Sequence, residues 1–123
     1  MAKNGKKVNR ITYTDGSKYA GDMEGYERHG HGTYHWNSGT RYTGNWVNGK
    51  IEGRGTLWYP GGSKFFGTFK DGLEHEGTMI YADGSKYVGK FKYGLEHGGG
   101  TFTGSDGFKY EGEFVEGRPV GAN

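Results

Sequence analysis

Apolar and polar positions alternate along most of the chain, and glycine interrupts the alternation at fixed places. From Tyr42 to Trp46, an aromatic residue, a glycine and a second aromatic residue occupy every other position. A period of two residues is typical of a β-strand, and no window shows a convincing 3.6-residue helical period. Turn dipeptides bound these segments, with Asn48-Gly49 at one end and Asp83-Gly84 at the other. The pattern therefore predicts a succession of β-hairpins.

The hairpins recur with a period of 23 residues. Five times, an aromatic residue is followed two positions later by glycine and four positions later by a large apolar residue, and a basic residue precedes each aromatic. Such a period is the signature of a repeat architecture. The sequence predicts a repeat domain over 13–121, preceded by a basic segment (1–12) that leads into the first strand and followed by a short tail (122–123). Its units are 19–41, 42–64, 65–86 and 87–109, with partial units at 13–18 and 110–121.

The odd repeat length constrains the loops. Successive side chains of a strand point to opposite faces, so every unit presents the same face only if its two loops differ in parity. A two-residue loop such as Asn48-Gly49 and a three-residue loop such as Ala82-Asp83-Gly84 satisfy this condition. The longer loop needs a left-handed residue at its third position, where every unit has glycine. Strands of 8 and 10 residues then complete the unit.

Two units depart from this pattern. The segment 25–32 carries Gly-Tyr where other units have pairs such as Asn48-Gly49, which predicts an unusual turn. The segment 72–78 is one residue short. We therefore expect an altered loop or a β-bulge between Leu73 and Glu76.

The register separates an aromatic face from a mostly polar face. Glycines of neighbouring strands, such as Gly55 and Gly67, come opposite one another, so aromatic rings can lie flat over bare backbone. A single-layer sheet cannot bury both faces, and the aromatic face could accept an amphipathic helix or an extended segment. The residues predicted to bind a partner there are Tyr19, Tyr42, Trp46, Tyr59, Phe65, Phe69, Tyr87, Phe91, Tyr110 and Phe114.

The unit Tyr-x-Gly-x-Trp/Phe-x-x-Gly-x-x-His-Gly-x-Gly-Thr resembles the MORN repeat (membrane occupation and recognition nexus). The clearest matches are 42–64 and 87–109, and the resemblance extends from Tyr13 to Gly121. It implies an all-β fold, an elongated single-layer antiparallel meander of about ten strands. It also implies a protein without enzymatic activity, since members of the family use such repeats as scaffolds that bind proteins or membrane lipids.

Composition agrees with a thin sheet. Leu, Ile, Val and Phe account for only 18 of the 123 residues, too few for a thick two-layer core. Aromatic residues reach 16% and the net charge is only +2, which argues against disorder and against nucleic acid as a partner. No apolar run approaches the length of a membrane span, and the basic N-terminus is not followed by the apolar stretch of a signal peptide. We expect a cytoplasmic protein, with cytoskeletal or membrane association as alternatives.

Histidines occupy one column of the repeat, at His29, His75 and His97, where the second unit has Glu52. We expect these side chains to bond nearby backbone. His29, His31 and His35 could share a face, but no carboxylate or cysteine clearly completes a metal site. Serines lie beside the loops without a positioned His–Asp pair, which disfavours nucleophilic catalysis. No cofactor or metal is expected.

A column of basic residues lies on the polar face, about 10 Å apart from unit to unit. It could bind an anionic surface such as phospholipid headgroups, or act as a solvated row that prevents sheets from stacking. Acidic residues on the same face dilute its field and favour the second interpretation. The column consists of Lys18, Arg41, Lys64, Lys86 and Lys109.

Four apolar residues fall on the polar face outside the repeat rule. They are Trp58, Phe66, Ile80 and Val88. Exposed apolar patches often mark interfaces, so this patch is a second candidate for partner binding. The alternative is local packing, in which Trp58 covers the Lys64 side chain.

Three functions follow from these patterns. The first is a non-catalytic scaffold or adaptor whose aromatic groove binds a helical or extended segment of another protein. The second is peripheral recognition of anionic phospholipid through the basic column. The third is self-association, for example as a homodimer, through the open terminal strands.

Overall fold

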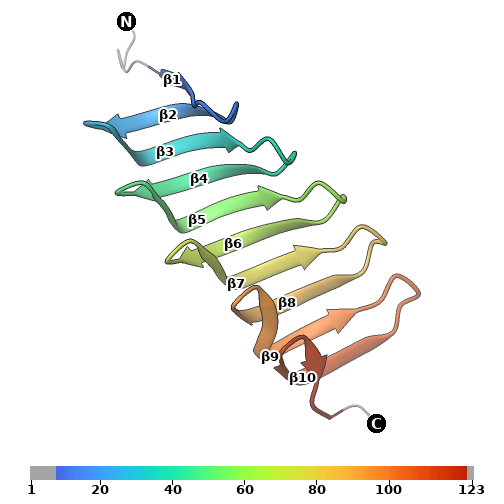
Figure 1. The fold of residues 1–123 in the computed structure, drawn as a ribbon. Helices are drawn as coiled ribbons and strands as arrows, with labels where there is room; N and C mark the ends of the chain where they lie inside the picture. Colours follow the sequence, from blue (N-terminus) through green and yellow to red (C-terminus); the bar gives the residue numbers. More distant parts are fainter. Residues whose placement is uncertain (1–7, 122–123) are drawn as a thin grey trace, which may run out of the picture.

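A single open sheet makes up the computed structural model, which describes residues 8–121. Its eleven strands are antiparallel and follow one another in chain order, so the first and last strands lie at opposite ends of an elongated ribbon (Figure 1). The described residues contain no helix. The all-β meander expected from the sequence is confirmed, with eleven strands where about ten were expected. The tail 122–123 and residues 1–7 of the basic segment lie outside the described residues.

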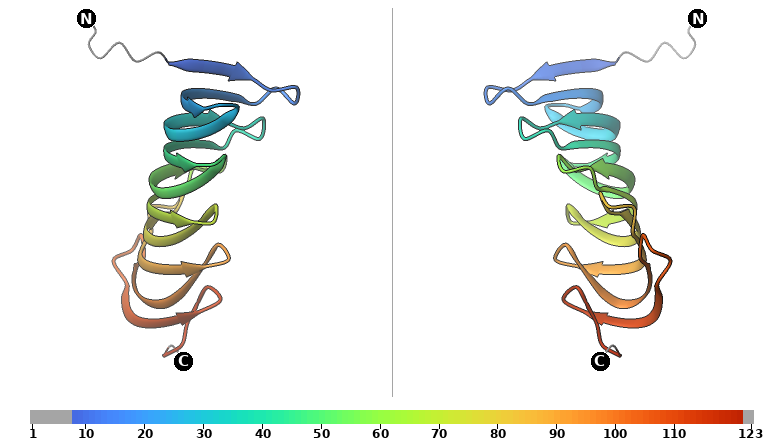
Figure 2. Two further views of the ribbon diagram at one scale, coloured as in Figure 1. Left: turned by 90° about the vertical axis from the view of Figure 1, so that its left-hand side faces the viewer. Right: turned by 90° about the vertical axis from the view of Figure 1, so that its right-hand side faces the viewer.

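The strands are β1 (Asn9–Thr12), β2 (Lys18–Glu24), β3 (Glu27–His35), β4 (Arg41–Val47), β5 (Lys50–Trp58), β6 (Lys64–Lys70), β7 (Leu73–Ile80), β8 (Lys86–Lys92), β9 (Leu95–Thr103), β10 (Lys109–Val115) and β11 (Arg118–Pro119). Strands β2 to β10 have seven to nine residues each, whereas the terminal strands β1 and β11 have four and two. Seen from the side, the strands bend across the width of the ribbon, so that the sheet is curved (Figure 2).

The two predicted loop types alternate along the ribbon. In the three-residue loop after β7, Tyr81 N donates to Ser85 O at 2.9 Å and Gly84 N donates to Tyr81 O at 2.9 Å. Gly84 has φ of 90°, the left-handed value expected at the third position. At the opposite edge, Asn48 (φ 49°) and Gly49 (φ 82°) form the two-residue turn. The parity argument is therefore confirmed.

Each of the four hairpins β2–β3, β4–β5, β6–β7 and β8–β9, which are closed by two-residue turns, also contains a β-bulge. The sequence indicated such a bulge only between Leu73 and Glu76. In the β4–β5 hairpin, Gly44 pairs with Gly55, but Trp46 pairs with Ile51. Three residues of β5 (52–54) thus face one residue of β4, and an excess of two leaves the faces unchanged. Arg41 pairs with Trp58, and Trp58 pairs with Lys64, which is the equivalent of Arg41 in the next unit. Equivalent residues therefore lie in line across the sheet, and without the bulge the register would shift from unit to unit.

The two irregular units behave as expected. Gly25 has φ of 61°, whereas Tyr26 is not among the residues with positive φ, so this turn differs from the Asn48-Gly49 turn. In the short unit, Thr68 pairs with Glu76 and Phe69 with Glu74, so His75 is the single extra residue. The missing residue is therefore absorbed at the bulge, as predicted between Leu73 and Glu76.

The histidine column connects three of the four bulges to the turn of the next hairpin. The backbone N–H of Asn48 donates to His29 Nδ1 at 3.2 Å, and the N–H of Asp71 donates to Glu52 Oε1 at 3.1 Å. The same contact joins Glu116 N to His97 Nδ1 at 3.4 Å. The expected bond to backbone is thus confirmed for His29 and His97, whereas His75 is exposed and makes no such bond to the described residues. Among residues 8–121, no group of three His, Cys, Asp or Glu side chains is placed to hold a metal ion.

The core is a continuous line of aromatic rings along one face of the sheet. Tyr42 meets Trp46 and Phe69 edge-to-face, with ring centroids 5.4 and 5.2 Å apart. Edge-to-face pairs of this kind are favoured by the ring quadrupoles. The line continues without a break to the C-terminal end, where Tyr87 meets Phe114 at 4.9 Å. A line of edge-to-face rings thus takes the place of the second layer that a single sheet lacks.

Candidate functional site

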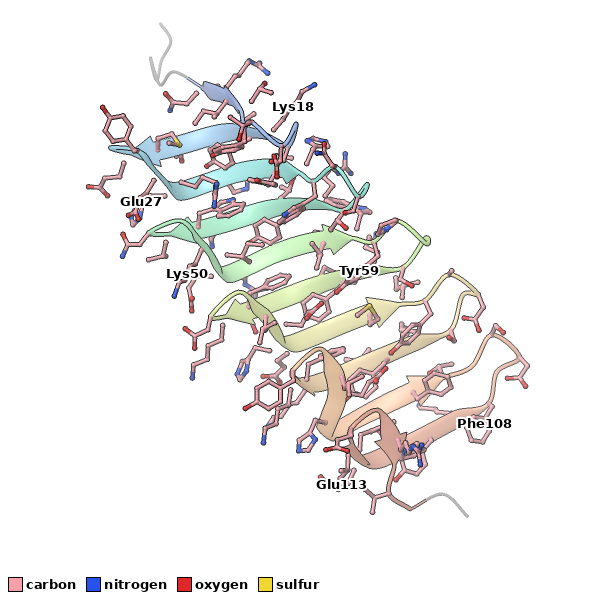
Figure 3. All side chains as sticks on the ribbon, in the orientation of Figure 1. Lys18, Glu27, Lys50, Tyr59, Phe108 and Glu113 are labelled. Atoms are coloured by element: carbon pink, nitrogen blue, oxygen red, sulfur yellow. The ribbon has the colours of Figure 1, made fainter. Side chains whose placement is uncertain are left out.

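A row of half-buried aromatic residues lies over this core, beside the three-residue loops. It consists of Tyr13, Trp36, Tyr59 and Tyr81, one from each successive unit, and we call it the outer aromatic row. Figure 3 labels Tyr59, which lies at the same edge of the ribbon as Phe108, whereas Glu27 and Lys50 lie at the opposite edge. The members of the row pack against the buried rings and remain accessible on one side.

Most of the predicted partner-binding residues of the aromatic face lie beneath this row. Tyr42, Phe65 and Tyr87 are each 0% exposed, so a partner cannot touch them in this conformation. Only Tyr59 and Tyr110 of the ten are half-buried. A direct role in binding stays a prediction for all ten, and these two are the ones that are accessible in this conformation. The other eight form the support on which the outer aromatic row rests: Tyr19, Tyr42, Trp46, Phe65, Phe69, Tyr87, Phe91 and Phe114.

The accessible side of the aromatic face, which we call the groove, holds an arginine among its rings at the N-terminal end. The Arg28 guanidinium lies 5.0 Å from the ring centroid of Tyr34 and 4.8 Å from that of Trp46. Its Nη1 donates to the Tyr13 hydroxyl at 2.9 Å, and its Nη2 donates to the carbonyl of Gly49 at 3.0 Å. Cation–π contacts and hydrogen bonds together hold this cation among the rings.

Two glutamates occupy the column of Arg28 further along the ribbon. The Tyr59 hydroxyl donates to Glu74 Oε2. Burial raises the pKa of Glu74, and burial likewise raises the pKa of Glu96. The ionisable side chains of this column therefore change from a guanidinium at the N-terminal end to carboxyl groups further along, and burial opposes the charged form of those carboxyl groups.

A pocket of about 470 Å³ opens at the C-terminal end of the aromatic face. Its walls are mainly apolar, and the carboxylates of Asp83 and Glu96 line it. Position 104 holds glycine, where the outer aromatic row would require a ring. The remaining lining includes Tyr81, Phe102, Phe108, Tyr110 and Phe114.

The polar face carries the basic column and the apolar patch side by side. The Arg41 guanidinium lies 4.0 Å from the ring centroid of Trp58, and Lys64 Nζ lies 5.6 Å from that of Phe66. Phe66 and Val88 are 41% and 44% exposed, whereas Trp58 and Ile80 are half-buried. Trp58 is thus covered by Arg41, in addition to pairing with Lys64 across the strands.

A shallow hollow of about 790 Å³ lies beside Phe66, lined mostly by polar side chains and glycine backbone.

Several residues of the groove were missed by sequence reasoning. Tyr13, Trp36 and Tyr81 stand in the same repeat column as Tyr59, so the repeat alone could have identified them. Arg28 and Glu96 were harder to find, because their column changes from one residue type to another along the chain: Arg28, Ile51, Glu74, Glu96 and Pro119.

Comparison with known proteins gives a family and a fold. A family model described as the MORN repeat matches residues 19–41, 42–64, 65–86, 87–109 and 110–122. No curated protein matches the chain by sequence. Among solved structures, the SAS-4 (dCPAP) TCP domain of Drosophila melanogaster, in complex with a proline-rich motif of Ana2 (dSTIL), is similar in fold, with a TM-score of 0.54 and 16% identity. The match covers 83% of this chain and 57% of that chain.

No helix in the described part of the chain is long and apolar enough to cross a membrane.

Proposed function

This chain belongs to the MORN repeat family, and we propose that it is a non-catalytic module that binds an extended segment of another protein along its aromatic face. The segment lies on the outer aromatic row and runs along the length of the ribbon. The observation that carries the proposal is the spacing of that row.

Each member of the outer aromatic row is separated from the next by two strands. Neighbouring strands lie about 4.8 Å apart, so the row has a period of about 9.6 Å. A polyproline II segment rises about 3.1 Å per residue with three residues per turn, which gives a period of about 9.3 Å. A segment of this kind places one residue in three over Trp36, then Tyr59, then Tyr81. Proline-rich segments dock on aromatic-lined grooves because they are already extended and lose little entropy.

The groove offers such a segment both apolar contact and polar anchors. The half-buried rings present accessible faces, and replacing water on them stabilises the complex by about 25 cal/mol per Å² of apolar area. The charges of Arg28 and Glu96 lie at different ends of the groove, which can fix the direction of the segment. The proline-rich motif in the SAS-4 complex supports this choice of partner, although that similarity concerns the fold alone.

A peptide series tests the proposal. We would compare a peptide with proline at every third residue against one of equal composition with irregular proline spacing, by isothermal titration calorimetry and amide NMR. We expect tighter binding of the first peptide, with shifts of the Trp36 indole N–H and none of the Trp58 indole N–H. Equal affinity of both peptides, or shifts confined to Trp58, would refute the proposed site. Binding only of an amphipathic helical peptide would indicate the other partner type.

Matched variants locate the site. Tyr59→Ser removes one ring of the outer aromatic row, and we expect it to weaken binding. Phe66→Ser removes an exposed ring from the opposite face and should leave binding unchanged. Circular dichroism of both variants checks that the sheet is intact.

A second candidate function rests on the composition of the basic column. Its residues alternate across the strands with His35, Trp58, Ile80 and Thr103, so this line of side chains contains no acidic residue. Cations interleaved with a tryptophan and an isoleucine suit an anionic phospholipid surface.

A further inference from the structure

Arg28 and Glu96 stand at equivalent positions of the repeat, three units apart. Arg28 pairs with Met23 at the end of β2, and Glu96 pairs with Phe91 at the end of β8. In both places the turn glycine of the following hairpin donates to the carbonyl of this residue, Gly49 to Arg28 and Gly117 to Glu96, each at 2.9 Å. The backbone surroundings therefore match, while the side-chain charge is reversed.

The rings around the two positions also correspond. Arg28 is surrounded by Tyr13, Tyr34 and Trp46. The equivalent positions three units on are Tyr81, Phe102 and Phe114, and all three line the C-terminal pocket together with Glu96. We call the three rings around the Arg28 guanidinium the first cage. The rings of the C-terminal pocket form an equivalent second cage, in which the carboxyl group of Glu96 stands where the first cage has the cation.

One further difference opens this second cage to solvent. At the first cage, the Trp36 ring lies against Tyr34, with centroids 4.5 Å apart. The equivalent of Trp36 is Gly104, which has no side chain to cover Phe102. The pocket of about 470 Å³ occupies this place. In addition, the Tyr81 hydroxyl is buried and has no hydrogen-bond partner among the described residues. The hydroxyl of Tyr13, the equivalent residue at the first cage, accepts a hydrogen bond from Arg28.

We propose that the C-terminal pocket binds an arginine side chain of the partner segment, with the guanidinium between the rings of Tyr81 and Phe102, Glu96 as its counter-ion and the Tyr81 hydroxyl as a further acceptor. This proposal rests on the proposed function, since it assigns one residue of the segment to one end of the groove. The arginine takes the place of the missing ring at position 104. It therefore stands one period of three residues beyond a residue that lies on Tyr81.

The chemistry of the pocket favours a guanidinium over other groups. A purely apolar side chain would leave Glu96 and the Tyr81 hydroxyl buried without partners, which costs binding free energy. A guanidinium is planar, stacks on aromatic faces and donates to two acceptors at once, whereas an ammonium is a compact and strongly hydrated charge. The Asp83 carboxylate at the rim adds to the negative potential that attracts a cation.

A pair of peptides tests the assignment. Both peptides carry proline at every third residue. One has arginine and the other glutamine three residues beyond the last proline. Each peptide is also made with its sequence reversed, because the direction of the segment along the groove is part of the test. We expect the arginine peptide, in one direction, to bind about tenfold more tightly, as for a hydrogen-bonded charge pair. The NMR shifts of Phe108 and Gly117 amides should appear with arginine only.

Variants of the pocket give a sharper comparison. Glu96→Gln should abolish the preference for arginine, measured as the ratio of the affinities for the arginine and glutamine peptides. Gly104→Trp restores the ring of the first cage and should exclude the arginine side chain, since φ at Gly104 is not positive and the nearest obstacle is the Asp106 side chain. Glu116→Gln is the control, because it neutralises an exposed glutamate of the neighbouring turn that does not line this pocket.

The outcomes separate the two proposals. Equal binding of the arginine and glutamine peptides, with shifts along the outer aromatic row, would overturn the arginine pocket and leave the proposed function standing. If neither peptide binds, N-acetyl-arginine methylamide is titrated alone at millimolar concentration. Shifts at Phe108 and Gly117 that Glu96→Gln removes would then support the pocket without the groove, and their absence would overturn both proposals.

Discussion

The ring of Tyr42 lies directly on the backbone of Gly55, and this contact recurs between the equivalent residues of other units. A β-carbon at position 55 would overlap the ring atoms of Tyr42, and the same holds for Tyr87 above Gly100. Tyr42 is completely buried as a result. The glycine is therefore a requirement of the core, since it lets an aromatic ring pack flat against a sheet that has no second layer.

We expect Gly55→Ala to destabilise the protein by about 1 to 3 kcal/mol, the usual cost of overpacking a core. The added methyl group forces Tyr42 out of its position between Trp46 and Phe69. The free energy of unfolding, measured by chemical denaturation, checks the value. Gly61→Ala is the matched control, because no atom lies near a β-carbon built there and its φ is not positive. A loss at position 61 equal to that at position 55 would contradict the explanation.

Burial also controls the ionisation of the same tyrosine. It raises the pKa of Tyr42 from 10.0 to about 12. A raised pKa in the folded state means that its contribution to stability is complete below pH 10 and is lost as the pH rises toward 12. We expect the free energy of unfolding to fall across this window.

Tyr42→Phe tests that interpretation. The variant loses the hydroxyl that donates to the carbonyls of Asn45 and Arg54, so we expect it to be about 1 kcal/mol less stable at neutral pH. It also lacks the ionisable group, and its stability should therefore depend less on pH between 10 and 12. Denaturation curves at both ends of the window measure the difference. Parallel pH dependences of the two proteins would show that Tyr42 does not titrate in this range.

The strands and loops could be predicted because they depend on short-range features. Gly84 sits at the only position of its loop that requires positive φ, and the odd repeat length then fixes the other loop at two residues. The bulge opposite Asn45 could not be predicted from such short-range features. It depends on the pairing between two strands, in which Gly44 faces Gly55 but Trp46 faces Ile51.

The candidate site was predicted less completely than the fold. Alternation places Tyr42 and Tyr59 on the same face but cannot tell that Tyr42 is covered by neighbouring rings and Tyr59 is not. That difference depends on how rings from three units stack. The equivalence of Arg28 and Glu96 was also missed, because a change of charge conceals the shared position until the surrounding rings are seen.

An insertion tests the role of the bulge in the short unit. We expect one glycine inserted between His75 and Glu76 to change the free energy of unfolding by less than about 1 kcal/mol, because bulges accept extra residues without moving the faces of the flanking strand. The same insertion between Phe66 and Gly67 should cost about 3 to 5 kcal/mol, since it turns a buried ring of β6 to the polar face. Equal losses at both sites would contradict this view.

Glu74 should make the stability of the protein fall as the pH rises, whereas a carboxylate in a salt bridge makes stability fall as the pH is lowered. Burial raises the pKa of its carboxyl group, so its contribution to stability is present at acidic pH and is lost as the pH rises through the folded-state pKa. We expect Glu74→Gln to raise the melting temperature at neutral pH, because the amide oxygen still accepts from Tyr59 without a charge. Near pH 4 the two proteins should melt together. A lower melting temperature of the variant at neutral pH would show that the charge is stabilising.

Phospholipid binding through the basic column predicts a salt dependence that peptide binding lacks. Each cation near an anionic bilayer contributes about 1 kcal/mol, and this attraction is screened between low salt and about 0.15 M. We therefore expect any binding to vesicles containing phosphatidylserine to fall steeply over that range and to be lost in the double variant Lys64→Glu, Lys86→Glu. The same variant leaves the outer aromatic row unchanged, so its affinity for the proline peptide should remain that of the original protein. Vesicle sedimentation and calorimetry measure the two affinities. Vesicle binding that survives both salt and charge reversal would exclude the basic column as a membrane site, because screening and charge reversal act on the same attraction.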